Sequence, residues 1–173
     1  MSNSTANSSE SRPIVLLTGA TGYVGGRLHS RFMARAILDR QATDFIMPDI
    51  TRCGGISELR KMANLAECYN VPIAPHNPNG PLSTIASAHV MATVPNFFRK
   101  EFMLKDVAWR DECLSHPLPI EGGHFVLPAR PGLGFDVNEE VLLQHPGLRT
   151  PRSTRRRANR QLLAYVYLPG SAP

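Results

Sequence analysis

The sequence predicts an α/β protein in which helices connect parallel strands. Three short apolar runs carry this prediction, because segments with helical periodicity separate them: Phe45–Pro48, Val71–Pro75 and Phe97–Lys100. Alternating strands and helices are typical of parallel sheets, in which each helix returns the chain to the start of the next strand. We therefore expect these three runs to lie side by side.

A titratable side chain follows each apolar run at once: Asp49, His76 and Glu101. In parallel α/β folds the chemistry gathers at the carboxyl ends of the strands. The sequence spacing from each of these residues to the next is close to the length of one strand–helix unit of a (β/α)₈ barrel, which is about 30 residues. The sequence therefore predicts part of a barrel active site.

The length of the chain limits this prediction. With 173 residues the chain suffices for one domain, but a complete barrel takes about 250 residues. The content of 42% hydrophobic and 19% charged residues is that of a soluble globular protein. We therefore expect an incomplete barrel.

The charge is concentrated near the C-terminus. The net charge is +5, but six arginines fall within residues 149–160, where there is no acidic residue. The other basic residues nearly balance the acidic ones, so the basic character belongs to residues 148–173. We expect this tail to be disordered, and we do not expect nucleic-acid binding, because no aromatic residues interleave with the arginines.

The three cysteines show no metal-ligand spacing, which favours a reducing compartment. There is no apolar leader at the N-terminus and no run of about 20 apolar residues that would span a membrane. These features predict a cytoplasmic protein without a membrane partner. Cys53 follows the first strand end closely, but no base is indicated beside it, so we expect an inert thiol.

The N-terminal part has a different pattern. Residues 1–12 are polar and expected to be disordered, and residues 13–35 predict a Rossmann-like strand, turn and helix. The glycines Gly19, Gly22 and Gly25 lie where the strand turns into the helix, and the helix can continue to Arg40. Glycines at such a turn let backbone N–H groups approach a pyrophosphate.

The run TGATGYVGGRL resembles the opening of the extended short-chain dehydrogenase/epimerase family, over about residues 13–30. The resemblance implies that Gly19, Gly22 and Gly25 contact NAD(P), and in that reading Asp49 would bind the ribose. The Tyr-x-x-x-Lys pair of that family is absent from the chain. A turn that no longer binds nucleotide is the alternative interpretation.

From about residue 36 to 147 the chain resembles the C-terminal third of the mandelate racemase group of the enolase superfamily, in particular the galactonate/mannonate-type acid-sugar dehydratases. The residues that carry the resemblance are Pro48–Asp49, Arg52–Ile56, Val71–Pro78, Pro95–Phe97 and Pro131–Gly134. The resemblance implies the last three strand–helix units of a (β/α)₈ barrel. The junction of the two resemblances near residue 35 indicates a fused or truncated gene product.

The dehydratase resemblance assigns roles to the three strand-end residues. It implies that His76 is the acid/base, that Asp49 orients it, and that Glu101 hydrogen-bonds the carboxylate side of an acid sugar. Members of this family are Mg²⁺-dependent lyases whose metal ligands come from earlier strands, and no segment here matches those strands. We therefore expect no metal ligand in this chain and no activity from it alone.

Two other functions remain open from the sequence, an NAD(P)-binding module and a non-catalytic protein that interacts through its arginine-rich tail. For partners, an incomplete barrel leaves strand edges and apolar surface uncovered. We therefore expect self-association or pairing with a complementing barrel fragment.

Overall fold

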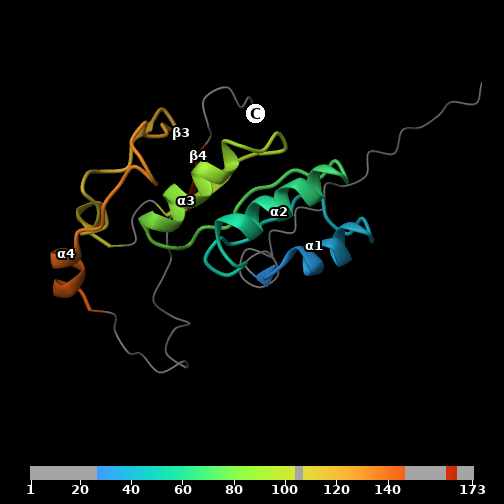
Figure 1. Ribbon diagram of the computed structural model, residues 1–173, viewed down its shortest axis with the longest axis horizontal. Helices are drawn as coiled ribbons and strands as arrows, with labels where there is room; N and C mark the ends of the chain where they lie inside the picture. Colours follow the sequence, from blue (N-terminus) through green and yellow to red (C-terminus); the bar gives the residue numbers. More distant parts are fainter. Residues whose placement is uncertain (1–26, 104–106, 147–162, 167–173) are drawn as a thin grey trace, which may run out of the picture.

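The computed structural model of the protein describes residues 27–103, 107–146 and 163–166 (Figure 1). The glycine turn with Gly19, Gly22 and Gly25, the strand expected before it and most of the basic tail lie outside the described residues. The described elements are the helices α1 (Arg31–Leu38), α2 (Ile56–Glu67), α3 (Pro81–Met91), η3 (Asp111–Cys113) and α4 (Glu139–Gln144), and the strands β1 (Lys100–Met103), β2 (Ile120–Glu121), β3 (His124–Phe125) and β4 (Leu163–Val166).

The three apolar runs pair in parallel, as the sequence predicts. Ile73 forms parallel bridges with Ile46 on one side and Phe97 on the other, so the run Val71–Pro75 lies in the middle. Prolines at 48, 72 and 75 remove backbone donors from these runs. The pairing is consequently limited to short bridges rather than long ladders.

The third run contains a β-bulge that the sequence does not predict. The backbone N–H of Phe98 donates to the carbonyl of Ile73, and that of Glu101 donates to the carbonyl of Pro75. Between these two hydrogen bonds the third run advances by three residues, whereas the middle run advances by two. The third run therefore holds one extra residue. Because side chains alternate between the faces of a strand, an extra residue changes the face on which Glu101 lies.

Helices α2 and α3 confirm the two helices predicted between the apolar runs. The apolar face of α2 is buried through Leu59, Met62 and Ala66, against a core that includes Ile46 and Ile73. After α2 the chain turns at Asn70, whose φ of 54° is a left-handed conformation that asparagine tolerates.

Helix α1 is shorter than predicted. The glycine turn was expected to continue as one helix from Tyr23 to Arg40, but residues 28–30 are not helical and α1 begins at Arg31. The Ser30 side chain caps this helix by accepting from the backbone N–H of Met33. The backbone N–H of Arg31 donates to Glu58 Oε1 at 2.8 Å, and this bond ties α1 to α2.

Strand β4 corrects two expectations about the tail and the sheet. It pairs antiparallel with β1, with Lys100 opposite Val166 and Met103 opposite Leu163. The prediction of a wholly disordered tail is therefore wrong for Leu163–Val166, and the sheet is not purely parallel. This pairing occupies an edge of β1 that a partial barrel would otherwise leave open.

The segment from residue 107 to 146 forms a separate layer beside α3 (Figure 1). It contains the antiparallel pair β2–β3 and an antiparallel bridge between Leu114 and Val137. Leu114 and Phe125 pack with Ile85 and Phe102 in a second apolar cluster. In the part of the chain that the structure describes, no helix has the length and apolar character needed to cross a membrane.

The packing of α2 leads to a first prediction. Leu59 is fully buried, so Leu59→Ala should leave a cavity and lower the free energy of unfolding by about 2–5 kcal/mol, measured by urea denaturation. The control is Leu143→Ala, because Leu143 is 80% exposed and its truncation should change stability by no more than about 0.5 kcal/mol. Equal effects of the two variants would contradict the assignment of this core.

Candidate functional site

The structure brings the three strand-end residues together. His76 Nδ1 lies 3.2 Å from Asp49 Oδ2, and His76 Nε2 lies 3.8 Å from Glu101 Oε2. All three side chains are buried. The parallel pairing of the three runs explains this arrangement, because it aligns their carboxyl ends at one edge.

Asp49 is held by a dense set of donors. Its Oδ1 accepts from the backbone N–H and the hydroxyl of Thr51 at 2.9 and 2.7 Å, and the Asn79 amide donates to both carboxylate oxygens. Burial alone would raise the pKa of Asp49, but hydrogen bonds from His76, Thr51 and Asn79 outweigh it and lower the pKa well below its usual range. Asp49 is therefore ionised at neutral pH.

An ionised Asp49 fixes the orientation of the His76 ring. A carboxylate can only accept, so the proton between the two groups belongs to His76 Nδ1. The second ring nitrogen, Nε2, then lies on the Glu101 side. The imidazole is therefore held with one nitrogen bound to Asp49 and the other directed to the neighbouring strand end, an arrangement suited to proton transfer at Nε2.

Glu101 is positioned by the loop that leads into α3. Its Oε2 accepts from the backbone N–H of Asn77 at 2.8 Å, and the Asn77 side chain is in turn bonded to Ser83 and Thr84 of α3. The other oxygen, Oε1, is buried and has no hydrogen-bond partner among the described residues. Glu101 therefore keeps one unused acceptor at the site.

Lys100 belongs to the same region, and sequence reasoning missed it. Its side chain is only 2% exposed, and its Nζ makes no hydrogen bond within the described part of the chain. Burial lowers the pKa of Lys100 to about 7. The negative charges of Glu101 and Asp49 act to raise this pKa, and the positive charge of Arg110 acts to lower it. The available signal was a lysine directly before the strand-end glutamate of an apolar run.

Asn79 is a second residue that the sequence analysis did not single out. It contacts Asp49 through its side chain, and its backbone carbonyl accepts from Arg110 at 2.8 Å. Asn79 thereby connects the strand-end loop with the segment that follows β1. The signal for it was the polar loop that separates His76 from Pro81.

The structure also bears on Cys53, on His89 and on the residues expected to contact a nucleotide. Burial raises the pKa of the Cys53 thiol to about 11, which fits the expected inert thiol. His89 is half-buried with Nε2 3.2 Å from the Leu133 carbonyl, a structural contact away from the site. The saturated Asp49 does not suit a ribose hydroxyl, and the predicted nucleotide contacts Gly19, Gly22 and Gly25 lie outside the described residues.

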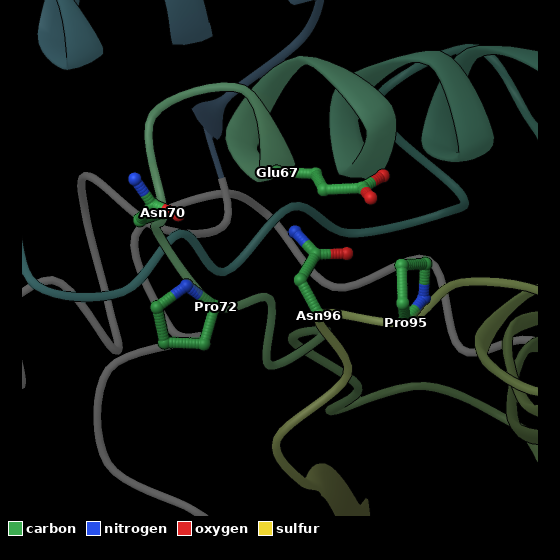
Figure 2. A pocket seen from close by; sticks show the side chains of 5 residues that line it. All are labelled: Glu67, Asn70, Pro72, Pro95 and Asn96. Atoms are coloured by element: carbon green, nitrogen blue, oxygen red, sulfur yellow. The ribbon is translucent and has the colours of Figure 1, made fainter.

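A pocket lies at the opposite end of the apolar runs (Figure 2). It is lined by Glu67, Asn70, Pro72, Pro95 and Asn96. The Asn96 amide donates to the carbonyls of Ala63 and Val71, so this side chain joins α2 to the middle run. Glu67 is the only titratable residue in this lining, so the lining holds no pair of groups for acid–base chemistry.

The described residues do not fit a magnesium site. Among residues 27–103, 107–146 and 163–166 no group of three or more histidine, cysteine, aspartate or glutamate side chains could hold a metal ion. Asp49, the most buried carboxylate of the site, already accepts from Thr51, Asn79 and His76. A magnesium ion prefers several carboxylate and water oxygens, and the described side chains of the site do not offer such a set.

The buried Lys100 predicts a pH dependence of stability. Its pKa is about 7 in the fold against an ordinary 10.5, so the unfolded chain binds this proton more tightly. The Lys100 contribution should therefore raise the free energy of unfolding as the pH increases from about 7 to 10. Lys100→Met should be more stable than the wild type at pH 7, and this difference should shrink by pH 10, measured by urea denaturation at each pH.

The exposed Lys61 of α2 provides the matched control for this experiment. Lys61→Met removes the same charge from the surface and should leave the pH dependence of the wild type nearly unchanged. A Lys100→Met protein that is less stable than the wild type at pH 7 would contradict the unpartnered placement of the ammonium.

Asp49 predicts the opposite pH dependence. Because its pKa is lowered by folding, its ionised form stabilises the protein above the ordinary aspartate pKa of about 4, and this contribution is lost as the pH falls below it. Asp49→Asn should cost about 1–3 kcal/mol at pH 7, and less at pH 3, in urea denaturation. The exposed Asp111 gives the control, and Asp111→Asn should change stability by no more than about 0.5 kcal/mol at pH 7. A loss for Asp49→Asn that is as large at pH 3 as at pH 7 would contradict this role.

The chain is similar to proteins of the dehydratase group. The chain is 37% identical to a D-xylonate dehydratase of Haloferax volcanii over 122 residues, which are 70% of this chain and 30% of that protein. It is 35% identical over 125 residues to D-galactonate dehydratase family member RspA of Halomonas elongata, over 71% of this chain and 31% of that one. This chain thus spans about a third of the length of the relatives it matches.

Solved structures show the same relation. A mandelate racemase/muconate lactonizing enzyme-like protein from Rubrobacter xylanophilus has a TM-score of 0.67 and 37% identity, over 73% of this chain and 33% of that chain. A mandelate racemase/muconate lactonizing enzyme, described as putative, from Burkholderia SAR-1 has a TM-score of 0.69 and 29% identity, over 74% of this chain and 32% of that one. The model of the family described as "Enolase C-terminal domain-like" matches residues 23–141. The chain therefore belongs to the enolase C-terminal domain-like family, within the mandelate racemase/enolase superfamily.

Proposed function

We propose that this chain carries the acid/base part of an acid-sugar dehydratase active site, which removes a proton next to a carboxylate with subsequent loss of water. The observation that carries the proposal is the placement of His76 between two buried carboxylates, Asp49 at 3.2 Å and Glu101 at 3.8 Å. The dehydratase names of the relatives and the similarity over 70% of the chain support it.

Each residue has a distinct task in this proposal. Asp49 accepts from His76 Nδ1 and favours the charged form of the ring, so that Nε2 can take up a proton and return it. Glu101, whose Oε1 is an unused acceptor, binds the substrate on its carboxylate side. Because all three side chains are buried, their mutual interactions are stronger than they would be in water.

The proposal includes inactivity of the chain on its own. Bound Mg²⁺ would stabilise the negative charge that develops on the substrate carboxylate, but the described residues do not fit such an ion. The chain covers only about 30% of the length of its dehydratase relatives. A complementing barrel fragment is therefore the partner that would complete the site.

Complementation tests this proposal. We expect no release of keto acid when the refolded chain alone is incubated with Mg²⁺ and D-xylonate. Addition of the preceding part of the Haloferax D-xylonate dehydratase, without its own matching segment, should produce turnover. His76→Ala should lower this turnover by at least about 100-fold, because acid–base catalysis contributes about 10²–10⁴-fold.

A second histidine variant separates a catalytic effect from a structural one. His89 lies on α3 and contacts the Leu133 carbonyl, outside the site. His89→Ala should keep the turnover of the complemented protein within a few-fold of the wild type. Turnover by the chain alone would refute the proposed inactivity, and turnover that survives His76→Ala would refute the assigned acid/base.

A further inference from the structure

Two buried polar atoms of adjacent residues lack partners at the site. Lys100 Nζ is a donor and Glu101 Oε1 is an acceptor, and neither makes a hydrogen bond within the described residues, not even with the other. The two side chains are 2% and 1% exposed. A buried charge without a hydrogen bond costs free energy, so a ligand that bonds to both atoms would stabilise the site.

The backbone explains why Lys100 and Glu101 can serve one site. The ring centroids of Phe45 and Phe98 lie 5.0 Å apart with the rings tilted by 31°, so these residues lie on one face of the parallel runs. The alternation of side chains in extended backbone then places Asp49 on the face of Phe45 and Lys100 on the face of Phe98. The bulge adds the one residue that brings Glu101 to this face as well.

The other polar groups of the site are already used. Asp49 accepts from Thr51, Asn79 and His76, and Glu101 Oε2 accepts from the backbone of Asn77. Asp49 and Glu101 are near enough to act on the charge of Lys100, yet neither forms a hydrogen bond with it. Among the described residues no group is therefore left to pair with the ammonium, and a bound molecule could supply the partner.

The two unused atoms define the chemistry of that molecule. It must present an acceptor to Lys100, preferably an anionic one, and a donor to Glu101. An inorganic anion such as sulfate offers acceptors only and would be repelled by the Glu101 carboxylate. A carboxylate with a neighbouring hydroxyl meets both requirements. A ligand bound in this way would lie near His76, whose Nε2 is 3.8 Å from the other oxygen of Glu101.

We propose that Lys100 binds the carboxylate of a 2-hydroxy acid while Glu101 accepts a hydrogen bond from the hydroxyl of the same ligand. This inference rests on the proposed function and specifies how that site holds its substrate. In this inference Lys100 is a substrate-binding residue, and the bulge places the side chains of Lys100 and Glu101 on the same face of the run.

Calorimetric titration of the full chain with sodium D-xylonate tests this inference, with xylitol and sodium sulfate as probes that lack the carboxylate or the hydroxyls. Wild type should bind D-xylonate more tightly than either probe. Lys100→Met should weaken D-xylonate binding by about tenfold or more, as expected for loss of a charged hydrogen bond. It should leave any xylitol binding unchanged. Thermal melting should show that Lys100→Met is folded, since it removes only an unpartnered buried charge.

Two further measurements separate binding by Lys100 from general electrostatics. The matched variant Lys61→Met should bind D-xylonate like the wild type, because Lys61 is exposed on α2. Titrations near pH 8 in buffers of different ionisation enthalpy should show proton uptake on binding by the wild type and none by Lys100→Met, because the ligand carboxylate favours a charged Lys100.

The outcomes distinguish this inference from the proposed function. If wild type and Lys100→Met bind D-xylonate equally, the role of Lys100 is wrong while the acid/base proposal stands. If sulfate binds as tightly as D-xylonate, the pairing of Lys100 with Glu101 does not select a hydroxy acid, and the inference is wrong. If the complemented protein turns over D-xylonate and the chain alone binds none of it, the assignment of this binding to the described residues fails.

Discussion

A buried, ionised Asp49 is the constraint on which the rest of the site depends. A carboxylate without exposure to water must be satisfied by fixed donors, and Thr51, Asn79 and His76 provide them. Each of these donors comes from the loop after a strand end. Satisfying one charge therefore orders two loops and sets the orientation of the histidine. The chemical arrangement and the local stability have the same physical origin.

Irregular backbone is equally important to this small fold. Prolines shorten the parallel pairing, and the bulge before Glu101 changes the face that the following residues present. On one edge of β1 the chain provides its own antiparallel strand, β4, in the direction opposite to that of barrel neighbours. A third of a barrel can thus bring three strand ends together without the remaining strands. It cannot provide what those strands would contribute, and the described residues contain no cluster of metal ligands.

The sequence was a good guide where the pattern is local. Helices α2 and α3 could be predicted because segments with helical periodicity separate the three apolar runs. The separate start of α1 at Ser30 was missed, because a helix through the glycine segment was equally consistent with the apolar spacing. Strand β4 was missed because four residues after an arginine-rich stretch carry little signal without their partner β1.

The sequence by itself determined the order of strands and helices and the identity of Asp49, His76 and Glu101, since each follows an apolar run directly. Only the tertiary structure decided which other groups surround them. The roles of Asn79 and Lys100 depend on contacts across 30 residues of chain or on a bulge, and neither produces a periodic pattern. In the sequence, a lysine that the fold buries cannot be distinguished from a lysine at the surface. For that reason the strand-end residues could be found from the sequence, but the unsatisfied pair beside them could not.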